Sequence, residues 1–238
     1  MRFPWCPQVP KVSATFVAGI LALAITGTVV APAGAFGKTA SVKPGPAVIA
    51  VSPSGRVQQL AAWILDSHDN GALPFAIIDK SAGKAFVFAR DGHSLGAAWV
   101  LTGLAPGDDS LPGIGTMPLS AIKPGMRTTP AGRFTAVLGR DLEAEVLWVD
   151  YPDAISMHPV INTTPSERRL ERIVSPKASD HRISFGCINV PAKFFSGVVK
   201  PTFQDGKGIV YILPDVKPLQ DVFPKYYDAV SASDLGAQ

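Results

Sequence analysis

The sequence lacks a strong excess of charge of either sign. Its 238 residues include 22 Lys and Arg against 19 Asp and Glu, so the net charge at pH 7 is only +3. Proteins that bind nucleic acids concentrate basic residues on one face or in one segment, whereas the basic residues here are spread along the chain. We therefore expect no nucleic-acid partner.

The sequence is not short of apolar residues, which excludes an intrinsically disordered chain. Hydrophobic residues make up 47% and charged residues 17%, a composition that suits one folded domain with a core. We find no internal repeat. Glycine and proline, with 22 residues each, predict many turns and favour short strands.

Long apolar runs are also missing, except near the N-terminus. Arg2 and Lys11 precede an uncharged stretch, 12–35, which ends in small residues around Ala33 and Ala35. This pattern predicts a signal peptide over 1–35, cleaved after one of these two alanines. The alternative is an uncleaved membrane anchor, because 12–33 is long enough to span a bilayer. Either outcome predicts export to the periplasm or cell envelope, with membrane contact only through an uncleaved segment.

Cysteine is scarce. Cys6 lies in the expected signal segment, so Cys187 is the one cysteine of the mature chain and no intramolecular disulfide can form. A free thiol in an oxidising compartment is a liability unless it is buried or used chemically. From the residues alone, a buried structural cysteine and a nucleophile both remain open.

After an expected linker over 36–54, the apolar periodicity predicts an N-terminal helix within 55–73. The rest alternates between strand-like runs and turns, interrupted by two expected helices, 167–173 and 192–199, and followed by a C-terminal tail over 215–238. Thr164 and Glu167 have the spacing of a capping box for the first of these helices. We therefore predict a mainly β fold, a sandwich with short helical insertions. The expected strands are 75–79, 84–88, 97–101, 134–138, 145–149, 155–160 and 208–213.

The surroundings of Cys187 fit a reactive turn. Gly186 allows the backbone to bend so that nearby amides could face a developing oxyanion. A thiol nucleophile also needs a base, and His158 and His181 are the two candidates. These three side chains could alternatively bind zinc, but their spacing lacks a paired local motif.

Two blocks resemble the catalytic domain of the L,D-transpeptidases. The run 184–189, Ser-Phe-Gly-Cys-Ile-Asn, is similar to the family signature Ser/Thr-His-Gly-Cys-apolar-Asn, and 129–134, Thr-Pro-Ala-Gly-Arg-Phe, is similar to an upstream family stretch. The family base would fall on His158. The resemblance covers roughly 74–214 and implies a mainly β, L,D-transpeptidase-like β-sandwich that acts on peptidoglycan stem peptides.

The resemblance also implies roles for single residues. His158 would take the proton of Cys187, and a main-chain carbonyl at Pro159 would orient this base. Amides at Gly186 and Cys187 would hold the oxyanion. The turn would be shaped by Ser184 and Asn189, and stem carboxylates could be bound by Arg182 and Arg133, although each arginine could equally be an ion-pair partner.

The implied reaction is acyl transfer through a cysteine thioester, with an amine as acceptor and without cofactor or metal. If water is the acceptor, the same site is an L,D-carboxypeptidase. Phe185 stands where the family has a second histidine, which keeps open a non-catalytic envelope module that binds peptidoglycan. A further departure is the long segment between His158 and Cys187, in which we expect 165–176 to border the cleft and contribute to acceptor choice.

Overall fold

The computed structural model describes residues 51–229. The predicted signal peptide, Cys6 and most of the predicted linker lie outside the described residues. Every described residue belongs to one compact unit. Within 51–229, no helix is long and apolar enough to cross a membrane.

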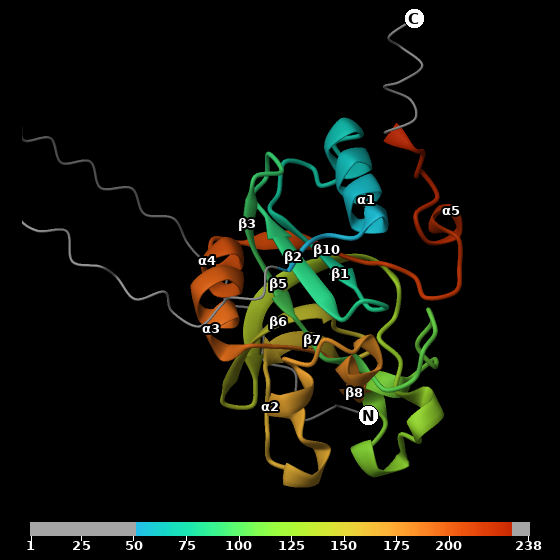
Figure 1. Cartoon of the computed structure of the whole chain (residues 1–238), viewed down its shortest axis with the longest axis vertical. Coiled ribbons are helices and arrows are strands. Elements are labelled where there is room, and N and C mark those ends of the chain that lie inside the picture. Colours follow the sequence, from blue (N-terminus) through green and yellow to red (C-terminus); the bar gives the residue numbers. More distant parts are fainter. Residues whose placement is uncertain (1–50, 230–238) are drawn as a thin grey trace, which may run out of the picture. The chain divides into compact units, whose positions relative to one another are not determined.

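The fold is mainly β, as predicted, and is built on one continuous eight-stranded sheet (Figure 1). Its strand order is β3-β2-β1-β10-β5-β6-β7-β9, and a two-stranded sheet pairs β4 with β8. The strands are β1 (Phe75–Asp79), β2 (Lys84–Phe88), β3 (Ser94–Trp99), β4 (Thr102–Gly103), β5 (Gly132–Asp141), β6 (Ala144–Asp150), β7 (Ile155–Pro159), β8 (Arg182–Ser184), β9 (Ile188–Val190) and β10 (Lys207–Ile212).

One buried cluster contains side chains from strands at both ends of the sheet. It includes Ala98 of β3, Ile78 of β1 and Val190 of β9, together with aromatic residues of the helical segment after β9. Strands from the two ends of the sheet therefore pack into the same core. The two layers of the predicted sandwich are parts of one continuous sheet.

A second cluster lies under α1 (Gly55–Asp66). Ser54 caps this helix by accepting a hydrogen bond from the Val57 amide. The helix buries Leu60 and Trp63 against β1, β2 and β10. Part of the predicted C-terminal tail, 215–238, also packs into this second cluster. Phe223, just after α5 (Leu219–Val222), is 3% exposed and is a member of the cluster.

The remaining helices are short. The segment after β9 continues from α3 (Ala192–Phe194) through a π-helical turn to α4 (Lys200–Phe203), so it runs beyond the predicted end at 199. Pro201 lacks an amide donor, which accounts for irregular hydrogen bonding in this stretch.

The predicted helix 167–173 begins at the wrong residue. Pro165–Glu167 forms a 3-10 turn and only Arg169–Arg172 is α-helical (α2). Thr164 makes no side-chain cap, and Arg168 adopts a left-handed conformation with φ 50°. Because this conformation interrupts a right-handed helix, the two pieces cannot join.

Candidate active site

Parallel pairing of β7 with β9 brings the predicted base and nucleophile together. On β7, Met157 points into the core, so Ser156 and His158 share the opposite face. The register pairs Met157 with Ile188 and His158 with Asn189. Cys187, one residue before β9, therefore lies next to Ser156.

The Cys187 thiol has polar neighbours on several sides. Its Sγ atom lies 3.7 Å from the Ser156 hydroxyl oxygen and 3.5 Å from the Ala154 carbonyl oxygen. The residue is half-buried. The Ser156 hydroxyl would donate to a thiolate at this position, whereas the Ala154 carbonyl accepts from the neutral thiol.

His158 is oriented by the residue that follows it. Its Nδ1 atom lies 2.8 Å from the Pro159 carbonyl oxygen. A carbonyl can only accept, so Nδ1 carries the hydrogen and Nε2 has the free lone pair. The contact agrees with the orienting role predicted for Pro159.

Each member of the pair changes the protonation of the other. Burial raises the pKa of the Cys187 thiol, but hydrogen bonds from His158 and Ser156 lower it, and the pKa lies below its ordinary value of 9.0. Burial lowers the pKa of His158, but the hydrogen bond and the negative charge of Cys187 raise it above 6.5. Both shifts favour a thiolate–imidazolium pair.

The turn before Cys187 is held by Ser184, as predicted. The Ser184 hydroxyl donates to the Cys187 carbonyl at 2.6 Å and accepts from the Gly186 amide at 3.1 Å. Gly186 has φ +136°, and a Cβ atom there would lie 2.9 Å from the Thr128 carbonyl oxygen. The glycine is therefore required, but its amide is already used by Ser184. The predicted oxyanion contact from Gly186 does not fit this geometry, which leaves the Cys187 amide as the candidate donor.

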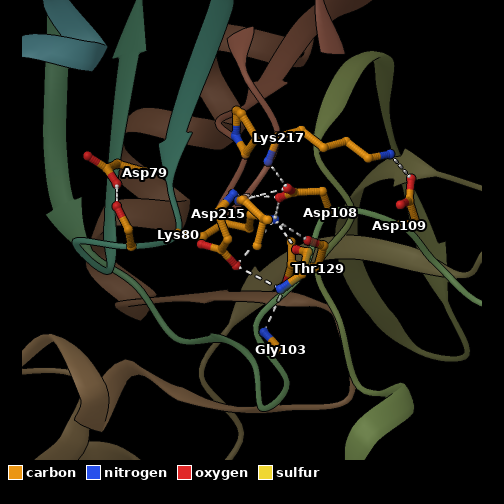
Figure 2. A network of polar contacts seen from close by, with 12 residues as sticks. Asp79, Lys80, Gly103, Asp108, Asp109, Thr129, Asp215 and Lys217 are labelled. Atoms are coloured by element: carbon orange, nitrogen blue, oxygen red, sulfur yellow. Dashed lines mark hydrogen bonds and ion pairs between the residues drawn. The ribbon is translucent and has the colours of Figure 1, made fainter. Parts of the chain in front are cut away.

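A buried polar network around Lys80 and Asp108 (Figure 2) contacts the same turn through Thr129. Thr129 donates its hydroxyl to the Gly186 carbonyl at 2.6 Å. Lys80, whose side chain is fully buried, donates to the Thr129 carbonyl at 2.8 Å and to Asp108 at 3.1 Å, and lies 3.6 Å from Asp215. The geometry of the turn thus depends on charged residues that lie far away in the sequence.

The predicted role of Asn189 in shaping the turn is wrong. Its side chain instead points to the base, with Nδ2 at 3.2 Å from His158 Nε2. Its Oδ1 atom accepts from Arg169 of α2 at 2.6 Å. Asn189 is 1% exposed and connects the segment 165–176, here called the inserted segment, to the base.

Both predicted substrate arginines form ion pairs within the described part of the chain. Arg133 donates to Asp69 at 2.6 Å, and Arg182 donates to Asp215 at 2.7 Å, where it joins the Lys80 network. These contacts support the ion-pair alternative. The function proposed below relies on neither arginine.

His181 has a different environment from His158. It is fully buried, its two ring nitrogens lie 2.8 Å from the Val100 carbonyl and 2.9 Å from the Ser175 carbonyl, and its ring stacks on Trp99. These contacts leave neither nitrogen for Cys187. Among residues 51–229, no group of three or more His, Cys, Asp or Glu side chains is placed to hold a metal ion.

Phe185, beside the cysteine turn, is one member of a stacked pair. The Arg127 guanidinium lies 3.8 Å from the centroid of the Phe185 ring, within the range of a cation–π contact. Phe185 is half-buried and contributes packing at this position.

Sequence reasoning missed Ser156 and Arg169. The period-two spacing of Ser156 and His158 could have revealed that both share a face. No local signal points to Arg169, because its contact depends on the tertiary path of 165–176.

A cavity of about 570 Å³ borders the base and is lined by His158, Pro159 and Ile161, by Phe195 and by residues 141–146.

Comparisons with known proteins give structural likeness only. No protein-family model matches the sequence, and no curated protein matches it. The helical cell shape determining protein Pgp2 of Campylobacter jejuni (K307A mutant) is similar with a TM-score of 0.42 and 16% identity, over 68% of this chain and 52% of that chain. An L,D-transpeptidase from Mycobacterium smegmatis is similar with a TM-score of 0.35 and 15% identity, over 59% and 58% of the two chains.

An L,D-transpeptidase of Xylanimonas cellulosilytica, residues 123–326, has a TM-score of 0.36 and 13% identity, over 59% of this chain and 60% of that one. This chain thus spans about half the length of the Pgp2 structure. With TM-scores below 0.5, these likenesses carry no conclusion about function.

Proposed function

We propose that this protein is an exported, cysteine-dependent peptidoglycan L,D-transpeptidase. The observation that carries the proposal is the Cys187–His158 pair, in which the pKa of the thiol is lowered and the pKa of the imidazole is raised. The family-like run at 184–189 supports the same activity. Export to the periplasm or cell envelope is supported by the N-terminal sequence pattern.

The reaction begins when His158 Nε2 takes the proton of Cys187. The thiolate attacks the carbonyl carbon at the L-centre of diaminopimelate in a stem tetrapeptide. The C–N bond to D-alanine then breaks, and D-alanine leaves with the proton from His158. The product of this half-reaction is a thioester on Cys187.

In the second half-reaction, an amine of another stem peptide attacks the thioester. His158 accepts a proton from this amine and returns it to the departing Cys187 sulfur, which restores the resting pair. The Cys187 amide is our candidate for holding the oxyanion in both steps. The cavity beside His158 gives a peptide access to the base.

Two alternatives follow from specific features. With water in place of the amine, the same thioester chemistry makes an L,D-carboxypeptidase. Phe185, packed against Arg127, removes a polar group from the site and motivates a non-catalytic module that binds peptidoglycan.

The test is product analysis with a purified disaccharide-tetrapeptide. We expect the full-length protein to release D-alanine and form cross-linked dimers, measured by liquid chromatography and mass spectrometry. Tripeptide without dimer would assign the carboxypeptidase, and no product together with binding to peptidoglycan would assign the non-catalytic module. The control is Cys187→Ser, which keeps the size of the side chain but replaces the nucleophile.

A further inference from the structure

A chain of two hydrogen bonds connects the inserted segment to the base. Arg169 Nη1 donates to Asn189 Oδ1 at 2.6 Å, and Asn189 Nδ2 lies 3.2 Å from His158 Nε2. Arg169 is itself held by Glu167 at 2.5 Å, and its side chain is 13% exposed. The guanidinium is therefore fixed and largely shielded from solvent.

Arg169 determines which way the Asn189 amide faces. A guanidinium has only donors, so the atom facing Arg169 must be the amide oxygen. The amide nitrogen consequently faces His158 Nε2 and donates to it. The Pro159 carbonyl already holds the hydrogen on Nδ1, so both contacts stabilise one neutral tautomer of His158.

This orientation opposes proton transfer from Cys187. Nε2 has a single lone pair, for which the Asn189 amide and the Cys187 thiol compete. After transfer, the new Nε2–H would face the Asn189 N–H, and the positive charge of Arg169 would lie near an imidazolium. The charge of Arg169 indeed lowers the pKa of His158, although burial lowers it more and Cys187 raises it.

We propose that Arg169 is a positioning residue that shifts the Cys187–His158 pair toward its neutral form, against the mutual stabilisation of thiolate and imidazolium, by fixing the Asn189 amide. The role in catalysis rests on the proposed function, whereas the effect on thiol protonation does not. The inserted segment thereby sets the reactivity of the nucleophile.

Other charged groups near His158 are few within the described chain. Cys187 precedes β9 and Arg169 comes from α2, and both act on the protonation of His158. Asp141, Glu143 and Glu145, at the ends of β5 and β6 and the turn between them, line the cavity that His158 borders. Glu143 pairs with Arg140 and Glu145 pairs with Lys200.

The test is the pH dependence of Cys187 alkylation by iodoacetamide in the full-length protein. The reaction is followed on the Cys187 peptide by mass spectrometry, because Cys6 also carries a thiol. We expect Arg169→Gln to alkylate about three- to tenfold faster than wild type near pH 5.5, since removing a nearby positive charge shifts such a pKa by roughly half to one unit. Arg169→Lys, which keeps the charge and a donor, should restore the wild-type profile.

Arg168→Gln is the matched control. It removes the same charge one position earlier, where the side chain is 70% exposed and pairs with Glu171, and it should leave the profile unchanged. An unchanged or slower low-pH rate in Arg169→Gln would overturn the proposal. So would an equal acceleration in Arg168→Gln, because the effect would then be general electrostatics.

Nitrogen NMR of the His158 ring gives a second readout that does not depend on alkylation. In the wild type we expect the tautomer with hydrogen on Nδ1, and in Arg169→Gln we expect imidazolium to persist to higher pH. An identical titration in the two proteins would contradict the proposal. Neither measurement uses peptidoglycan, so failure of the proposed function would appear separately, as absence of product from a stem peptide.

Discussion

At the scale of single residues, the site depends on two groups that change each other's protonation. Neither Cys187 nor His158 would be reactive through burial alone, because burial moves both pKa values toward the neutral forms. The interaction of each group with the other, together with contacts to Ser156 and Pro159, reverses both shifts. The thiolate therefore depends on one identified histidine.

We predict that His158→Ala loses the alkylation of Cys187 at low pH. Without the imidazole, the pKa of the thiol rises, and at pH 6.5 the rate should fall about tenfold or more because the thiolate is the reacting form. His181→Ala should keep the wild-type pH profile and lower the melting temperature, since it loses the ring contacts with the Val100 and Ser175 carbonyls and the stacking on Trp99. Loss of the low-pH rate only in His181→Ala would reverse the assignment.

Local motifs predicted some of these residues and missed others for a physical reason. Cys187, Ser184 and the Pro159 carbonyl act within a few residues of one another, so a short motif contains their geometry. Asn189 and Arg169 act across 20 residues of sequence, and only the folded path of 165–176 brings them together. Such contacts leave no periodic or spacing signal in a single sequence.

At the scale of elements, short apolar runs bounded by turn residues predicted the long paired strands well. β1 and β2 match their predicted ranges, and β5, β6, β7 and β10 overlap theirs. The three-residue strands β8 and β9 were not predicted, because each is too short for a pattern and is defined by distant partners. The start of β3 was also missed, since Ser94 and Leu95 are exposed and give no apolar alternation.

The buried network under the cysteine turn gives a prediction on pH stability. Burial raises the pKa of Asp108, but the amides of 215–217 and the Lys80 ammonium donate to it and lower the pKa to about 2, from an ordinary 3.8. A lowered folded pKa stabilises the protein above the ordinary value, and this stabilisation is lost as the pH falls toward 2. The contribution is roughly 2 kcal/mol.

We therefore predict that Asp108→Asn is about 2–4 kcal/mol less stable than wild type at pH 7 and closer to it at pH 2.5. Urea unfolding at several pH values measures this. Asp109→Asn is the control, because Asp109 is 72% exposed and pairs with Lys217 on the surface. Equal effects of the two substitutions at pH 7 would show that the buried network does not stabilise the fold.

At the scale of the whole molecule, the end of the described chain completes the core under α1. Trp63 packs against Phe223 and Tyr226, and its indole nitrogen donates to the Lys225 carbonyl at 3.1 Å. In Figure 1, α1 and α5 lie on the same side of the sheet. We predicted 215–238 as a tail, so the apolar and aromatic residues within 215–229 were not assigned to the core.

We predict that Phe223→Ala lowers the free energy of unfolding by about 3–5 kcal/mol, the usual cost of removing a buried aromatic ring. Val216→Ala, at a position 79% exposed, should cost less than about 0.5 kcal/mol. The pH profile of Cys187 alkylation should be unchanged in folded Phe223→Ala. A stability loss no larger than that of Val216→Ala would mean that this segment is not part of the folded core.

The central claim is that Cys187 is a nucleophile activated for attack on a carbonyl. Incubation of the full-length protein with a carbapenem, followed by intact mass and peptide mapping, tests this most directly, because the strained carbonyl reports acylation without a peptidoglycan acceptor. We predict one covalent adduct per chain, mapped to Cys187, that is absent in Cys187→Ser and slowed by a factor of about 10²–10⁴ in His158→Ala. A wild-type protein that remains unmodified, or an adduct mapped to any residue other than Cys187, would contradict the account.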